Sequence, residues 1–112
     1  DHCTAIYTVL NDGKSGESYN ISANNEINNI TIVEKILSYM NKSPDLIEFI
    51  EDRPGHDFRY SMSSSKIRKE LHWNQECNFD KGLEQTIDWY LENEDWWKNI
   101  PQQTLNSTPW KN

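Results

Sequence analysis

Two short stretches that alternate like β-strands, at residues 18–21 and 46–50, lie in a sequence whose other apolar patterns are helical. Two strands alone do not form a stable sheet, so such strands are more secure at the edge of a larger sheet. The sequence therefore predicts a mostly helical α/β unit that adds its strands to a sheet absent from this sequence. We expect the chain to be a fragment of something longer.

The helical patterns fall in five places. Apolar residues at helical spacing predict helices over residues 1–10, 31–41, 63–73, 79–91 and 94–100. Asp1 is the expected N-cap of the first helix, and Thr31 with Glu34 forms a capping box for the second. A helix that begins at the first residue has nothing in front to orient it, which is also typical of a fragment. Residues 24–29 are expected to be an Asn-rich loop, and 101–112 a polar tail after a lobe of residues 1–100.

Composition limits the classes of partner. Only 35% of the 112 residues are apolar, while 12% are aromatic, so a few large rings must supply much of the burial. A net charge of -7 disfavours nucleic acids and anionic membranes. No apolar run approaches the roughly 20 residues of a membrane span, and we expect a cytoplasmic protein. Cys3 and Cys77 have no metal-knuckle spacing, so reduced thiols are expected.

The positive charge is concentrated in one segment. Residues 53–70 hold five basic and two acidic side chains, or +3, whereas the rest holds six basic and sixteen acidic, or -10. All three arginines of the chain lie in this basic segment. Because the planar guanidinium matches phosphate oxygens, this concentration favours binding of a phosphorylated small molecule.

A tight turn is expected within the basic segment. Arg53-Pro54-Gly55-His56 fits a type II turn, in which Pro fixes the first central residue and Gly supplies the positive φ of the second. Such a turn brings Arg53, His56 and the amides around Gly55 toward one anion. The alternative is a surface turn whose arginines pair with nearby carboxylates, namely Glu48, Glu51 and Asp57.

Other candidates have simpler structural explanations. Asn28 and Asn29 precede a helix, where their amides either read a ligand or are solvated. A cluster of aromatic residues either stacks on a base or sugar or packs in the core: Trp89, Tyr90, Trp96 and Trp97. The sequence has no Gly-rich phosphate loop, no Tyr-x-x-x-Lys pair and no metal cluster. From these residues we expect binding without catalysis.

Several motifs together resemble one family. They are GExYNI at residues 16–21, NExxN at 25–29, DRPGHDxRY at 52–60, WYL at 89–91 and WW at 96–97. With them the sequence resembles the C-terminal part of the dTDP-glucose 4,6-dehydratases, in the extended short-chain dehydrogenase/reductase superfamily. The resemblance runs from residue 1 to about residue 98. It implies the α/β fold class, as a C-terminal lobe without its Rossmann domain.

The resemblance also implies a function. The family is an NAD-dependent lyase that oxidises the sugar at C4, removes water across C5 and C6, and returns the hydride to C6. Its cofactor-binding glycines and catalytic Tyr and Lys belong to the Rossmann domain, so we expect NAD in the complete enzyme and none on this fragment. The positions that match the family's dTDP-sugar contacts, with Arg53 toward the diphosphate, are Asn29, Asp52, Arg53, Pro54, Gly55 and His56.

Two alternatives stay open beside this interpretation. One is a stand-alone interaction module that kept the lobe's fold, and the other is a fragment of a related nucleotide-sugar epimerase or decarboxylase. If the chain is a fragment, a lobe without its sheet is expected to expose an apolar face and to self-associate through it. The expected partners are thus a dTDP-sugar, the missing Rossmann domain and a second copy of the chain.

Overall fold

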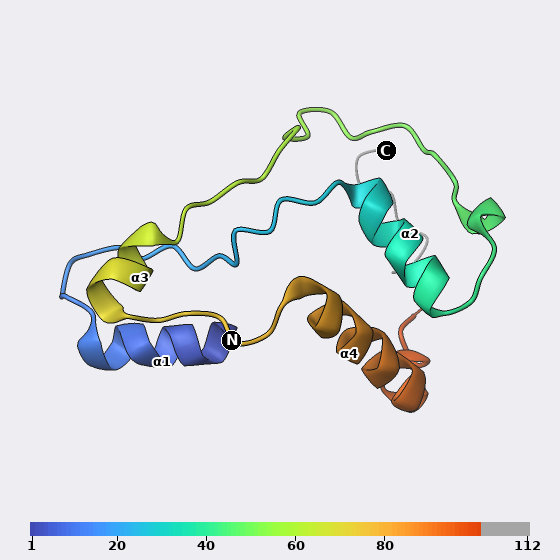
Figure 1. Cartoon of the computed structure of the whole chain (residues 1–112). Coiled ribbons are helices and arrows are strands. Elements are labelled where there is room, and N and C mark those ends of the chain that lie inside the picture. The colour runs from blue at the N-terminus through green and yellow to red at the C-terminus, as the bar shows by residue number, and fades with distance from the viewer. Residues whose placement is uncertain (102–112) are drawn as a thin grey trace.

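The computed structural model describes residues 1–101, in which helices are joined by long extended segments (Figure 1). The elements are α1 (His2–Asp12), α2 (Asn29–Tyr39), the short 3-10 helix η1 (Pro44–Leu46), α3 (Ser65–Leu71), α4 (Phe79–Glu92) and α5 (Glu94–Trp97). The mostly helical character and the five α-helices are confirmed. The predicted tail, apart from Pro101, lies outside the described residues.

The two predicted strands are wrong, because residues 1–101 contain no β-strand. Residues 18–21 are extended but lack the backbone ladder of a sheet. Within 46–50, the first residue belongs to η1, which begins where the Ser43 hydroxyl accepts a hydrogen bond from the Asp45 amide at 3.2 Å. The rest is extended, with Phe49 and Ile50 exposed. An alternating pattern specifies strand pairing only when a neighbouring strand is present.

Asp1 is the N-cap residue of α1 as expected, whereas the capping box predicted for the second helix is wrong. Helix α2 begins at Asn29, two residues before Thr31, so Thr31 and Glu34 lie inside the helix and form no capping box. Asp1 is the N-cap residue of α1, but its carboxylate accepts hydrogen bonds from the amides of Glu76 and Cys77, at 2.9 and 3.1 Å. This contact ties the start of α1 to the segment before α4.

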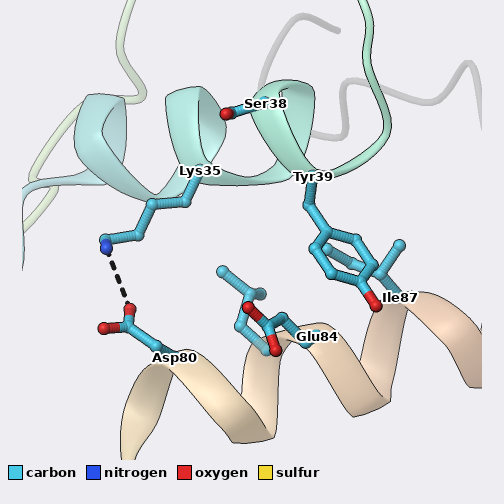
Figure 2. Close-up of a pocket in the computed structure, with 7 residues that line it drawn as sticks. Lys35, Ser38, Tyr39, Asp80, Glu84 and Ile87 are labelled. Atoms are coloured by element: carbon cyan, nitrogen blue, oxygen red, sulfur yellow. Dashed lines mark ion pairs between the residues drawn. The ribbon is translucent and has the colours of Figure 1, made fainter.

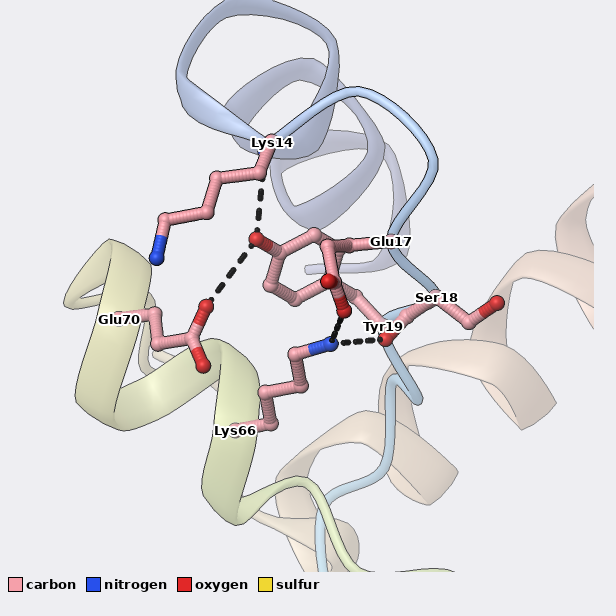
Figure 3. A network of polar contacts seen from close by, with 6 residues as sticks. All are labelled: Lys14, Glu17, Ser18, Tyr19, Lys66 and Glu70. Atoms are coloured by element: carbon pink, nitrogen blue, oxygen red, sulfur yellow. Dashed lines mark hydrogen bonds and ion pairs between the residues drawn. The ribbon is translucent and has the colours of Figure 1, made fainter.

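One packed unit joins α1 to α3. Ala5 and Ile67 are fully buried there, and Trp73 is nearly so, with its indole N–H donating to the Thr4 hydroxyl at 3.2 Å. A polar network fastens the α1–α2 connection to α3 (Figure 3). In it, the Lys66 ammonium lies 2.6 Å from Glu17, and the Tyr19 hydroxyl donates to Glu70 at 3.2 Å.

A second unit joins α2 to α4, away from the first (Figure 1). The Tyr39 hydroxyl donates to Asp88 at 2.8 Å, and Lys35 pairs with Asp80 at 2.9 Å. The radius of gyration is 18.0 Å, against about 13 Å for a compact domain of 100 residues. The long segments between the two units carry the predicted site.

Candidate functional site

The predicted turn has the geometry of a type II turn. The Arg53 carbonyl accepts a hydrogen bond from the His56 amide at 3.3 Å, and Gly55 has φ 70°. Asp52 braces the turn, because its carboxylate accepts from the Arg53 amide at 2.8 Å and lies 2.6 Å from His56 Nδ1. The turn expected from the Pro-Gly pair is therefore confirmed.

A pocket of about 380 Å³ adjoins this turn, and we call it the Arg53 pocket. It is lined by Asn29, Ile50, Glu51, Asp52, Arg53 and His56. Asn29 is the first residue of α2 and lies far from the turn in sequence, yet the two meet here. Four of the six predicted site residues thus share one pocket, while Pro54 and Gly55 shape the turn beside it.

Asp52 and Arg53, two charged residues of the Arg53 pocket, have different hydrogen-bond partners. The hydrogen bond from His56 lowers the pKa of Asp52 below its ordinary value, so this carboxylate is ionised at neutral pH and orients the imidazole through Nδ1. The guanidinium of Arg53 donates a hydrogen bond to the Tyr60 hydroxyl at 3.4 Å. Since a guanidinium has five N–H donors, this contact with a neutral hydroxyl engages only part of the Arg53 fork.

A larger pocket of about 550 Å³ adjoins the first and shares Asn29 with it. Its lining residues are Asn25, Glu26, Ile27, Asn28, Asn29, Phe58, Arg59 and Tyr60. Phe58 and Tyr60 are exposed, and Arg59 pairs with Glu26 across the pocket. Sequence reasoning gave Glu26 and Phe58 no role. In the sequence, the signal for Phe58 was the alternation over residues 58–62, in which Phe58, Tyr60 and Met62 occupy every second position.

The pocket between α2 and α4, of about 340 Å³, is better explained by packing (Figure 2). Its Lys35 and Asp80 pair with each other, and Tyr39 donates to Asp88 nearby. The aromatic cluster also packs on itself, with Trp89 edge-to-face against Tyr90 and Trp96 at 5.2 Å between ring centroids. No trio of side chains suited to a metal ion occurs within residues 1–101. No helix of that region is long and apolar enough to cross a membrane.

Comparison with known proteins identifies the family. The profile of the family described as "GDP-mannose 4,6 dehydratase" matches residues 1–86. A probable dTDP-glucose 4,6-dehydratase of Sinorhizobium fredii is 42% identical over 107 residues, covering 89% of this chain and 31% of that protein. The dTDP-glucose 4,6-dehydratase of Neisseria meningitidis is 40% identical over 111 residues, with the same coverage.

Solved structures agree with the sequence matches. The dTDP-glucose 4,6-dehydratase of Bacillus anthracis, crystallised with NAD, superposes with a TM-score of 0.82 at 43% identity and covers 87% of this chain and 30% of that one. The chain spans about a third of the length of these relatives and matches their C-terminal part. The relatives named above are dTDP-glucose 4,6-dehydratases. Because the family profile matches residues 1–86, this chain belongs to the GDP-mannose 4,6-dehydratase family.

Proposed function

We propose that this chain is the nucleotide-sugar-binding lobe of a dTDP-glucose 4,6-dehydratase, and that the Arg53 pocket takes the diphosphate. One observation carries the proposal: Asn29, Asp52, Arg53 and His56 line a single pocket although they come from two separate segments. Arg53 supplies a cationic fork for phosphate oxygens, and Asn29 supplies an amide. Pro54 and Gly55 fix the turn that presents Arg53.

Asp52 has an indirect part in this proposal. A carboxylate repels a diphosphate, but Asp52 is engaged by His56 and by the Arg53 amide, so its charge is partly compensated inside the turn. It therefore serves to hold the turn and the imidazole. We place NAD and the hydride and proton transfers outside this chain, because its sequence has neither a Gly-x-Gly-x-x-Gly loop nor a Tyr-x-x-x-Lys pair.

Titration of dTDP into the isotopically labelled chain, followed by NMR, tests the proposal. We expect an affinity no better than millimolar, which weakens with salt because the pocket is open. Arg53→Ala should weaken it at least about tenfold, since a charge-assisted pair is worth roughly 1.5–3 kcal/mol. Lys69→Ala, in the same basic segment, is the control and should bind like the wild type. Equal binding by the wild type and Arg53→Ala contradicts the proposal.

A further inference from the structure

Glu26 forms a clamp between the two segments that carry the site. It lies in the Asn-rich loop, three residues before Asn29. Its carboxylate accepts a hydrogen bond from the Ser61 hydroxyl at 2.5 Å and pairs with the Arg59 guanidinium. Both partners belong to the extended segment that follows the Arg53 turn. A single side chain therefore joins the loop before α2 to the segment after the turn.

The same clamp reaches Arg53 through Tyr60. Tyr60 lies between Arg59 and Ser61 in sequence, and its hydroxyl accepts the hydrogen bond from Arg53. On the other side, only two residues separate Glu26 from Asn29. The two walls of the Arg53 pocket are thus each connected to Glu26 by a short path.

The covalent path between these walls is much longer. From Asn29 it runs through α2, η1 and the extended residues 47–52 before it reaches Arg53. Much of this region and of the segment after the turn is exposed, with Phe49 at 85% and Phe58 fully accessible. Segments with so few buried apolar contacts are held weakly by packing, so polar contacts across them decide their separation.

We propose that Glu26 is a positioning residue for the Arg53 pocket: by holding Arg59 and Ser61, it sets the separation between Asn29 and Arg53. This inference rests on the proposed function, since it assigns Glu26 an effect on diphosphate binding through the placement of Arg53. The hydrogen bonds from Ser61 and Arg59 keep the pKa of Glu26 below its ordinary value, so the clamp is ionised at neutral pH.

Glu26→Gln tests the clamp in the same dTDP titration. The amide cannot form the ion pair with Arg59, and we expect the affinity to fall about three- to tenfold. Glu17→Gln is the matched control, because Glu17 is a similarly half-exposed carboxylate paired with a basic residue, Lys66, outside the pocket. The control should leave dTDP binding unchanged. Wild-type affinity in Glu26→Gln overturns the inference.

Two further variants separate positioning from simple loss of structure. Exchanging the charges, in Glu26→Arg with Arg59→Glu, should restore most of the affinity; failure to do so in a chain with a native NMR spectrum counts against the clamp. In an Arg53→Lys background, the loss caused by Glu26→Gln should shrink, because an ammonium has no planar fork to orient. Equal loss in both backgrounds shows that Glu26 acts independently of Arg53 and contradicts the inference.

The outcome for Arg53 distinguishes the two proposals. If Arg53→Ala binds dTDP as tightly as the wild type, the proposed function fails, and Glu26 then has no diphosphate site to position. If Arg53→Ala loses affinity while Glu26→Gln does not, the function stands and only the clamp fails.

Discussion

Gly55 shows how one residue determines the shape of the site. Its φ of 70° is unfavourable for residues with a side chain, and no atom beyond its two chain neighbours lies within 4 Å of where a Cβ would be. Gly55→Ala is therefore expected to strain the turn by roughly 1–2 kcal/mol without a clash, and to weaken dTDP binding in NMR titrations. Gly55→Asn should be milder, because Asn tolerates this conformation better.

Gly16 provides the control for this prediction. It also has a positive φ, 84°, and open space around it, but it lies outside both site pockets. Gly16→Ala should carry a similar backbone strain and leave dTDP affinity unchanged. If both substitutions reduce affinity equally, the effect of Gly55 comes from general destabilisation.

The ion pairs of Glu17 and Glu26 predict how the stability of the folded chain depends on pH. The hydrogen bond from Lys66 lowers the pKa of Glu17 below its ordinary 4.5, and Ser61 and Arg59 lower that of Glu26. A lowered pKa means that the folded chain favours the ionised form. The stabilisation is present above pH 4.5 and is lost as the pH falls through the lowered values. The near-ultraviolet circular dichroism of the chain should weaken in this acid range.

Replacing a carboxylate by an amide shows whether that residue is responsible for the loss of stability in acid. Glu17→Gln should reduce the acid sensitivity of the α1–α3 unit, because its amide does not titrate. At high pH the sign is reversed, since Glu17 raises the pKa of Lys66 and that stabilisation is lost as the pH rises through the raised value. An acid transition of this unit that is identical in wild type and Glu17→Gln contradicts the assignment.

Among the elements, α1 and α3 meet at the fully buried apolar side chains Ala5 and Ile67. Ile67 is completely buried against Ala5 and Trp73, so Ile67→Ala is expected to cost about 2–5 kcal/mol. Leu10→Ala is the control, because Leu10 lies on α1 but is 79% exposed. Denaturant titration followed by tryptophan fluorescence should show a large loss for the first variant and little for the second. Equal effects contradict this placement of the core.

The helices were predictable from sequence because their signal is local. The spacing of Phe79, Leu83 and Ile87 is enough to place α4 within one residue of its observed end. The turn was predictable for the same reason, since Pro54 and Gly55 carry their own backbone preferences. The strands and the α2 cap failed because they depend on partners: residues 18–21 have no neighbouring strand, and Thr31 competes with a helix start at Asn29.

The site was predictable only in part. The Arg-Pro-Gly-His turn stands out in sequence because its charges and its turn residues are contiguous. Its association with Asn29 came from the family resemblance, and the pocket brings the two together. The role we give Glu26 depends on contacts with Arg59 and Ser61, more than thirty residues away. No local pattern identifies a partner at that separation.

At the scale of the whole molecule, the chain buries little of its apolar surface. Among residues 1–101 the buried hydrophobic side chains are Ala5, Ile67, Trp73 and Ile87, while large residues such as Leu10, Phe49 and Trp96 are exposed. Relatives about three times as long contain this region as their C-terminal part. We infer that much of the exposed surface is an internal interface in proteins of that length.

Because the proposal places NAD binding and catalysis outside this chain, it predicts that the chain alone does not convert dTDP-glucose. With NAD and dTDP-glucose added, the purified chain should form no 4-keto-6-deoxy product, because the hydride- and proton-transfer groups are placed outside it. A dTDP-glucose 4,6-dehydratase similar to the chain, such as that of Neisseria meningitidis, serves as the positive control. Authentic turnover by the purified chain would falsify this assignment.

The exposed apolar faces lead to the last prediction, which concerns assembly. Ile6, Tyr7 and Leu10 on α1 are 51%, 69% and 79% exposed, and apolar patches of this kind promote association. We expect sedimentation of the chain to depend on concentration, and its thermal transition to be broad. Leu10→Lys should reduce the association, because it places a charge within the patch, whereas Lys14→Gln just after α1 should not. A strict monomer with a sharp two-state transition contradicts the prediction.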